Sequence, residues 1–243
     1  IGQTITLQDA KNAHGVATLD GVRLYIDALN AAGGVHGRQI VLRVLDDQNK
    51  AAQAEANAQK LIDDGAFLLF GCIEGGPSSA VAKIASAANV PLFGPMAGPP
   101  TLRRPHLPMV FPVRAEHREE FRALMKHGAT QGKRTVAFMH ADSDGGRQHL
   151  ENVKLIAAEL DMRVVLALPF KGDIGDEGID TMIASLAKAE ADMLFNHGSA
   201  GLYQKLIAKA KQAGSKANFM AVNSGSSQIA QGLGPLAEGM LFA

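Results

Sequence analysis

Short apolar stretches alternate with amphipathic stretches along the whole 243-residue chain. The apolar stretches are rich in Val, Ile, Leu and Phe, and most are apolar at every position. This pattern is typical of parallel strands that helices cover on both faces. We expect such strands at residues 40–45, 67–71, 90–93, 110–113, 135–140, 163–168, 193–195 and 219–222, with a further strand-like run starting at Ile1.

The stretches between these strands carry apolar residues at spacings of three and four, the period of an α-helix. The first helix has Val16, Leu19, Val22, Ile26 and Leu29 on one face, and a pair of glycines ends it. Further helices are expected at residues 50–64, 79–88, 117–131, 148–160, 179–189 and 202–213. Strands that alternate with helices of this length predict right-handed βαβ units in doubly wound parallel sheets, an α/β fold.

The order of elements in the first half of the chain nearly repeats in the second half. We therefore predict two lobes, residues 1–114 and 115–239, with residues 240–243 starting a second crossover between them. The first crossover, at Val113–Glu116, contains no low-complexity linker. A short crossover suits a hinge, because few residues have to absorb the rotation.

Charge and composition exclude several classes of partner. Lys+Arg and Asp+Glu both number 24, and no basic cluster exceeds a pair, so we expect no nucleic-acid partner. The longest apolar runs fall far short of the roughly 20 residues that span a bilayer, so we expect no direct membrane insertion. The sequence begins at Ile1 with neither a signal peptide nor an initiator Met, so we expect a mature or trimmed form. A single cysteine, Cys72, excludes an intramolecular disulfide and is expected to be a small buried apolar residue.

Sequence motifs of enzymes are absent. The chain has no Walker loop, GxGxxG, GxSxG or CxxC motif, so we expect neither enzymatic activity nor a cofactor. Residues 142–145 resemble the start of a calcium loop, but position twelve is Val153 rather than Glu. The eight histidines are scattered without metal-ligand spacing, so we expect no metal site. Asp46 and Asp47 are interpreted as solvated loop residues.

Four stretches carry a family resemblance, namely NAAGGVHGR at 30–38, FGCIEGGPSS at 70–79, VPLFGPMAG at 90–98 and AKQAG at 210–214. Taken in order, they resemble the branched-chain amino-acid-binding (Leu/Ile/Val-binding) family of type I periplasmic binding proteins. The resemblance implies a monomeric, periplasmic, two-lobed protein that closes over a small-molecule ligand and delivers it to the membrane permease of an ABC importer. Members of the family have a further C-terminal portion that completes both lobes, so the resemblance also implies that this portion is missing from the chain.

In open α/β sheets, ligands bind beyond the carboxyl ends of the strands. The stretch Glu74–Ser79 fits this rule and matches the family's ligand loop. Gly75 and Gly76 allow backbone N–H groups to approach a ligand closely, and Ser78 or Ser79 can cap the following helix. A helix N-terminus favours an anion by about 0.3–1 kcal/mol, so a ligand carboxylate is expected there.

Two further segments of the first lobe are candidates. Met96, Ala97 and Gly98 follow the next strand and are expected to line the same cleft. His14 stands roughly where the resemblance implies an aromatic contact, with an exposed loop histidine as the alternative. The family usually has hydroxyl residues at the positions of Gly75 and Gly98, so carboxylate recognition here is expected to depend on main-chain N–H groups.

The second lobe differs from the family at several ligand positions. Gly145 and Ser199 stand where relatives commonly carry aromatic residues, and Asn223 stands where amino-acid binders carry an acid that pairs with the ligand ammonium. Asn supplies no countercharge, although Asp144 or Asp142 can compensate. We therefore expect a small carboxylate-bearing ligand, first an aliphatic amino acid and next an aromatic or other organic acid. A ligand-sensing receptor or regulatory domain of the same fold is the alternative.

Overall fold

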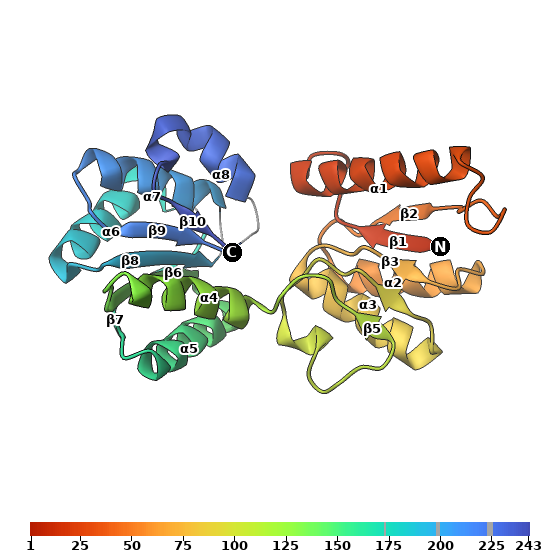
Figure 1. The fold of residues 1–243 in the computed structure, drawn as a ribbon, viewed down its shortest axis with the longest axis horizontal. Helices are drawn as coiled ribbons and strands as arrows, with labels where there is room; N and C mark the ends of the chain where they lie inside the picture. Colours follow the sequence, from red (N-terminus) through yellow and green to blue (C-terminus); the bar gives the residue numbers. More distant parts are fainter. Residues whose placement is uncertain (173, 198–199, 223–225) are drawn as a thin grey trace. The chain divides into compact units, whose positions relative to one another are not determined.

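The computed structural model describes residues 1–172, 174–197, 200–222 and 226–243. The chain divides into two compact units, Ile1–Glu116 and His117–Ala243, each built on one five-stranded sheet (Figure 1). All paired strands in both sheets run parallel. The predicted α/β class with two parallel sheets is confirmed.

The first unit has the strand order β2-β1-β3-β4-β5. Its strands are β1 (Gly2–Ile5), β2 (Arg43–Asp46), β3 (Leu69–Phe70), β4 (Leu92–Phe93) and β5 (Val110–Phe111). Its helices are α1 (Ala13–Ala31), α2 (Ala51–Asp63), α3 (Gly75–Ala88) and the short 3-10 helix η1 (Pro100–Leu102).

The second unit has the strand order β10-β9-β8-β6-β7. Its strands are β6 (Thr135–Ala141), β7 (Arg163–Phe170), β8 (Met193–His197), β9 (Asn218–Ala221) and β10 (Leu241–Phe242). Its helices are α4 (His117–Thr130), α5 (Asp144–Glu159), α6 (Gly175–Ala189), α7 (Ala200–Gln212), α8 (Ser226–Leu233) and the 3-10 helix η2 (Gly234–Ala237). Residues 240–243, predicted to start a crossover, contain β10, one of the two edge strands of this sheet.

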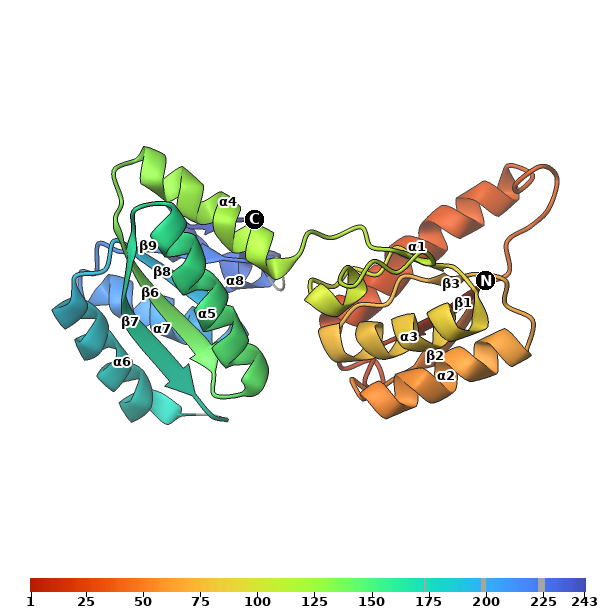
Figure 2. The same ribbon diagram turned by 90° about the horizontal axis from the view of Figure 1, so that it is seen from below.

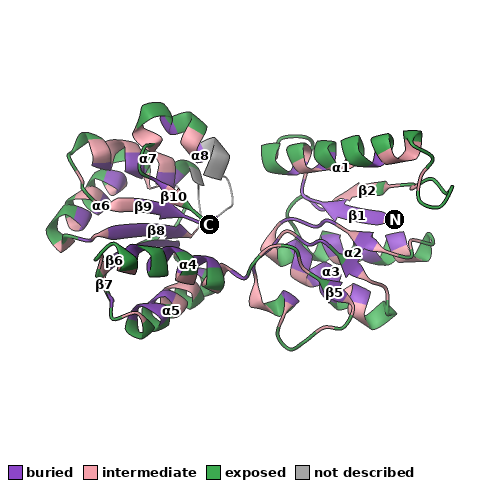
Figure 3. Cartoon of the chain, in the orientation of Figure 1, coloured by how far each residue is buried: buried purple, intermediate pink, exposed green. Residues whose placement is uncertain are grey.

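The two faces of the first sheet are covered unequally. Leu69, Leu92 and Val110 are buried against α2 and α3, which lie side by side (Figure 2). Side chains alternate along a strand, so the next residues of β4 and β5, Phe93 and Phe111, point to the opposite face, where both are 48% exposed. Helix α1 itself keeps most of its residues in solvent (Figure 3).

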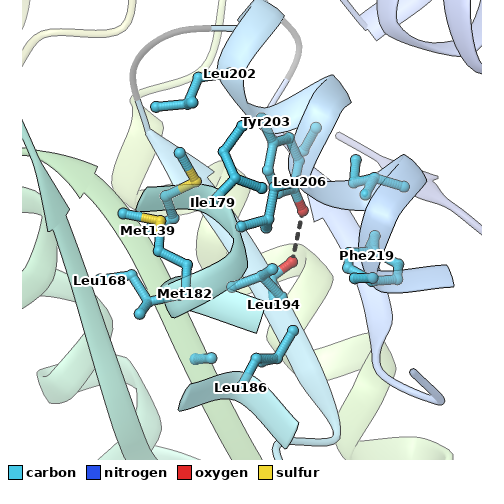
Figure 4. Close-up of a cluster of buried hydrophobic side chains, with 14 of the residues drawn as sticks. Met139, Leu168, Ile179, Met182, Leu186, Leu194, Leu202, Tyr203, Leu206 and Phe219 are labelled. Carbon is cyan, nitrogen blue, oxygen red and sulfur yellow. Dashed lines mark hydrogen bonds between the residues drawn. The ribbon is translucent and has the colours of Figure 1, made fainter. Parts of the chain in front are cut away.

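The second sheet is covered on both faces. Helices α4 and α5 pack beside each other on one face, over a cluster that includes Phe121, Phe138 and Phe195. Helices α6 and α7 pack on the other face, where Tyr203 is buried among Leu194, Leu206 and other apolar side chains (Figure 4). Consecutive residues of β8 therefore face opposite cores, which explains why residues 193–195 are apolar without alternation.

Each of the predicted strands and helices has a counterpart, but three helices begin four residues earlier than expected. Helix α3 begins at Gly75 rather than at residue 79, α5 at Asp144 rather than at residue 148, and α6 at Gly175 rather than at residue 179. The first turn of each contains two glycines, whose low helix propensity favours a loop when the sequence is considered alone. Helix α8 and the strand β10 are further elements that the periodicity did not predict.

Two other observations bear on the sequence predictions. Within the described ranges, no helix is both long enough and apolar enough to cross a membrane. Cys72 is buried, as predicted, and burial raises the pKa of its thiol to about 12. A thiol with so high a pKa stays protonated at neutral pH and is a poor nucleophile.

Candidate functional site

The candidate residues of the first unit lie in loops at the carboxyl edge of its sheet. All strands of this sheet are parallel, so the loops after β1, β2, β3 and β4 leave the same edge. A backbone hydrogen bond from Met96 N to Cys72 O (2.8 Å) joins the loop after β4 to the loop after β3. The predicted segments 74–78 and 96–98 are therefore neighbours in the structure.

The start of α3 differs from the predicted serine cap. Glu74 is the N-cap residue, and Gly75 is the first residue of the helix. The hydroxyl of Ser78 donates to Ile73 O (3.0 Å), and that of Ser79 donates to Gly75 O (2.8 Å). Neither serine caps α3, because the helix begins before both of them.

Gly75 and Gly76 leave the N-terminus of α3 accessible. Gly76 is exposed and Gly75 half-buried. A Cβ atom on Gly76 would meet nothing within 4 Å, and one on Gly75 would lie 3.8 Å from the Pro99 side chain. N–H groups in a first helical turn have no acceptor within the helix. This turn can therefore donate to an anion that approaches the edge of the sheet.

The segment 96–98 is more enclosed than its sequence suggests. The half-buried side chain of Met96 packs against a buried cluster of Ile5, Leu19 and Ile73. Ala97 and Gly98 are buried, and Ala97 O accepts from the guanidinium of Arg103 at 3.3 Å. Met96 is thus the residue of this segment whose side chain is partly exposed at the edge.

His14 is the second residue of α1 and is exposed. The loop that precedes it is held by Asp46, whose carboxylate accepts from the backbone N–H groups of Leu7 (3.0 Å), Gln8 (3.3 Å) and Asp9 (3.1 Å). Partial burial opposes ionisation of Asp46, but these hydrogen bonds and one from Gln48 N lower its pKa below the ordinary value. The N-terminus of α1 is therefore fixed relative to the strand edge.

Asp47 is a structural residue rather than a solvated one. It is 1% exposed and accepts from the hydroxyls of Thr6 (2.6 Å) and Thr4 (3.3 Å). Burial raises its pKa above the ordinary value, although these hydrogen bonds act in the opposite direction. The prediction that both aspartates are solvated is wrong for Asp47.

In the second unit, the predicted residues Asp144 and Gly145 open α5. Ser143 is the N-cap, and its hydroxyl accepts from Gly146 N (3.2 Å). Asp144 is fully exposed and pairs with Arg147 (2.7 Å), which also pairs with Asp142 (2.6 Å). Gly145 is exposed at this edge. The predicted residues Ser199 and Asn223 lie outside the described residues.

Three histidines that the sequence analysis did not single out converge in the second unit. His117, His149 and His197 each offer a ring nitrogen within 4.8 Å of the other two. Their ring centroids lie 5.2 Å apart for His117 and His149, 5.4 Å for His117 and His197, and 3.8 Å for His149 and His197. The expectation that the histidines are scattered is wrong for these three.

Each of these histidines lies one helical turn or one strand repeat away from a buried residue on the same face of its element. His117 precedes Phe121 by four residues on α4, and His149 precedes Val153 by four on α5, so each lies one turn before a buried residue on the same face. His197 follows Phe195 by two on β8 and shares its face. These spacings were the available sequence signal, but the convergence depends on how three elements pack.

Comparisons with known proteins identify the family and the fold. The model of a family described as periplasmic binding protein matches residues 1–243. The leucine-, isoleucine-, valine-, threonine-, and alanine-binding protein of Pseudomonas aeruginosa is 27% identical over 224 residues, which cover 91% of this chain and 59% of that protein. The chain thus spans less than two thirds of the length of this curated relative.

Two solved structures share the fold. A substrate-binding periplasmic protein from Ralstonia solanacearum has a TM-score of 0.84 at 20% identity, covering 98% of this chain and 68% of that one. An ABC transporter substrate-binding protein from Desulfitobacterium hafniense, in complex with Leu, has a TM-score of 0.77 at 21% identity, covering 95% and 68%. At these identities the likeness shows the fold alone.

Proposed function

Because this chain belongs to the periplasmic binding protein family, we propose that it is an extracytoplasmic solute-binding protein of an ABC importer and binds a small aliphatic amino acid. The single observation that carries the proposal is the accessible first turn of α3, where Gly75 and Gly76 open a helix at the carboxyl edge of a parallel sheet. The curated relatives are named for binding leucine, isoleucine and valine, which supports the class of solute.

The ligand carboxylate binds the first turn of α3. Backbone N–H groups there point out of the helix, and the helix dipole favours a negative charge by about 0.3–1 kcal/mol, or up to about 2 kcal/mol when partly buried. Both glycines let a carboxylate approach the main chain without a side chain in between. Recognition through main-chain groups offsets the absence of a hydroxyl at Gly75 and Gly98.

The ligand side chain contacts the partly exposed Met96, whose flexible thioether adapts to different aliphatic shapes. In the second unit, Gly145 presents no side chain where relatives commonly have an aromatic residue. The missing ring leaves room for a bulkier solute, so an aromatic amino acid ranks next after the aliphatic ones. Asn223 supplies no countercharge for the ligand ammonium, so the amino group contributes less to affinity than in the amino-acid binders.

Delivery of the ligand to the importer depends on closure of the two units over it. The ligand contacts loops of both units, here His14 and the segments 74–78 and 96–98 of the first, and Asp144, Gly145, Ser199 and Asn223 of the second. It therefore binds the closed state more tightly and shifts the population towards it. Moving the population from 1:99 to 99:1 needs about 5.5 kcal/mol of differential binding. The closed monomer is the form that the membrane permease recognises.

The test is titration calorimetry of the purified protein with leucine, isoleucine, valine, alanine and phenylalanine, and with 4-methylpentanoic acid, which has leucine's carbon skeleton without its amino group. Saturable binding of an aliphatic amino acid is expected, with only a modest loss for the acid. Binding should also raise the thermal midpoint, since ligand at 100 times Kd stabilises by about 2.7 kcal/mol. No saturable binding of any of these solutes would refute the proposal.

The site is tested with Gly75→Val, which places a branched side chain at the first turn of α3. Affinity should fall at least about 10-fold because the side chain blocks main-chain approach, equivalent to about 1.4 kcal/mol. Gly21→Val is the matched control, since Gly21 lies in mid-α1 with nothing within 4 Å of its Cβ position. Equal affinities in the two variants would exclude this turn as the site. Gly98→Val is less informative, because Gly98 is buried and the substitution also disturbs packing.

A further inference from the structure

We propose that His117, His149 and His197 form a binding site for a divalent transition metal of the Zn²⁺ class in the second unit. The site lies at the carboxyl edge of the sheet, because His197 is the last residue of β8, His117 the first of α4, and His149 lies near the start of α5. It draws on no residue of the proposed amino-acid site, so its existence does not depend on the proposed solute.

The donor atoms are close enough to share one ion. One ring nitrogen from each histidine lies within 4.8 Å of the other two. Zinc binds imidazole nitrogen at about 2.0–2.1 Å, which in tetrahedral geometry places two nitrogens about 3.3 Å apart. The nitrogens therefore need to approach by at most about 1.5 Å, a distance that small rotations of the imidazole side chains cover.

Glu120 orients one of the three ligands. Its carboxylate lies 3.2 Å from His117 Nδ1, and its side chain is only 5% exposed. With Nδ1–H donating to this carboxylate, the lone pair of His117 lies on Nε2. A carboxylate that accepts from the second nitrogen of a histidine is the usual partner of a metal ligand, because it fixes the tautomer and makes the imidazole more basic.

His149 has a buried ring nitrogen that a metal ion would satisfy. Its Nδ1 is buried and has no hydrogen-bond partner among the residues that the structure describes. A buried polar atom without a partner costs free energy, and coordination of a metal ion would remove that cost.

The donor set determines the class of ion. Imidazole nitrogens suit Zn²⁺, Cu²⁺, Ni²⁺ and Co²⁺, whereas Ca²⁺ and Mg²⁺ prefer oxygen ligands. Three protein ligands leave one tetrahedral position for water or a small ligand, whereas structural zinc sites usually have four protein ligands. The rings also rest on an aromatic layer, since Phe121 lies 5.9 Å from His149 between ring centroids. Simple packing of the rings on this layer is the outcome that the experiment has to distinguish from coordination.

The experiment is titration of the chelator-treated protein, produced without a polyhistidine tag, with Zn²⁺ alone and with Co²⁺ as a spectroscopic substitute. One ion per chain is expected by calorimetry, together with visible Co²⁺ absorption bands of a tetrahedral site. His149→Gln and His197→Gln should each weaken binding at least about 100-fold, and Glu120→Gln about 10–100-fold. The control is His127→Gln, an exposed histidine on the same helix as His117, which should change nothing.

Circular dichroism and thermal unfolding show whether each variant is folded, and Glu120→Gln keeps the proposal testable if a histidine variant is not. The proposal is overturned if the parent protein binds no ion stoichiometrically. It is also overturned if folded His149→Gln and His197→Gln bind as tightly as His127→Gln. Amino-acid binding is measured in separate titrations, so its failure is distinguishable from failure of the metal site.

Discussion

The carbonyl oxygen of Thr6, the residue that follows β1, occupies the space that a Cβ atom on Gly15 would need. Gly15 is the third residue of α1, and its N–H donates to the side chain of the N-cap Asn12 (2.9 Å). The helix therefore starts in direct contact with the strand that precedes it. This contact fixes the position of His14, which lies between Asn12 and Gly15.

Gly15→Ala should lower the free energy of unfolding by about 2–3 kcal/mol, because the methyl group forces the helix away from the strand. Gly21→Ala on the same helix is the control. Its Cβ would meet nothing within 4 Å, so it should stabilise by about 0.5–1 kcal/mol through the helix propensity of alanine. Urea unfolding followed by circular dichroism measures both. A Gly15→Ala variant as stable as the parent would contradict the contact.

The second unit repeats this arrangement with two adjacent glycines. A Cβ on Gly146 would collide with Ala141 O, whereas one on Gly145 would lie 4.0 Å from Ser143 Oγ. Gly146→Ala should therefore cost about 2–3 kcal/mol, and Gly145→Ala should be neutral or slightly stabilising. The two variants differ by one position, so they control for each other in the same unfolding experiment. Equal stability of the pair would show that α5 does not begin as described.

Much of the fold was predictable from sequence because a strand that is buried on both faces is apolar at consecutive positions. Met193 and Phe195 face α4 and α5, while Leu194 faces α6 and α7, so all three positions are apolar. Such a run identifies a central parallel strand without knowledge of its neighbours. Elements with a weaker hydrophobic pattern were not predicted, among them the edge strand β10, which is only two residues long.

The candidate site was only partly predictable. The location of Gly75 and Gly76 at the carboxyl edge of the sheet followed from the rule for parallel sheets. Their inclusion in α3 was not predicted, and the predicted serine cap was wrong, because the helix begins before Ser78, whose hydroxyl donates to Ile73 O. The buried role of Asp47 depends on Thr4 and Thr6, more than 40 residues away. The histidine cluster likewise depends on three elements meeting, which no local spacing encodes.

The next prediction concerns the buried hydroxyl of Tyr203. The Tyr203 hydroxyl lies 2.8 Å from Leu194 O and 2.9 Å from Met220 O, and the ring is fully buried (Figure 4). Tyr203→Phe removes the hydrogen bonding of the hydroxyl to these carbonyls while keeping the ring. The free energy of unfolding should therefore fall by about 1–1.5 kcal/mol. Tyr25→Phe is the control, because Tyr25 is 71% exposed. Chemical denaturation that finds the two variants equally stable would mean that the hydroxyl adds nothing.

The second unit should become less stable in acid, because the carboxylate of Asp192 then loses its negative charge. The carboxylate of this residue accepts from Arg134 N (2.8 Å), Thr135 N (2.9 Å) and the Thr135 hydroxyl (2.9 Å), and so ties the starts of β6 and β8 together. The N–H of Arg134 contributes most to lowering the pKa of Asp192 below its ordinary value, although partial burial opposes it. A lowered pKa in the folded state means that the charged carboxylate stabilises the fold at neutral pH. This stabilisation is lost as the pH falls through the folded pKa.

Asp192→Asn should therefore cost about 1 kcal/mol at pH 7, a figure reduced for the partial exposure of the group. The difference from the parent should shrink as the pH falls below the ordinary carboxyl pKa and through the lower folded pKa, because the parent's carboxylate then takes up a proton. Asp20→Asn, on the exposed face of α1, is the control substitution and should change stability little at pH 7, since its carboxylate lies in solvent. Urea unfolding at a series of pH values measures the difference. A cost for Asp192→Asn that stays constant into strong acid would show that the charge of this carboxylate does not stabilise the unit.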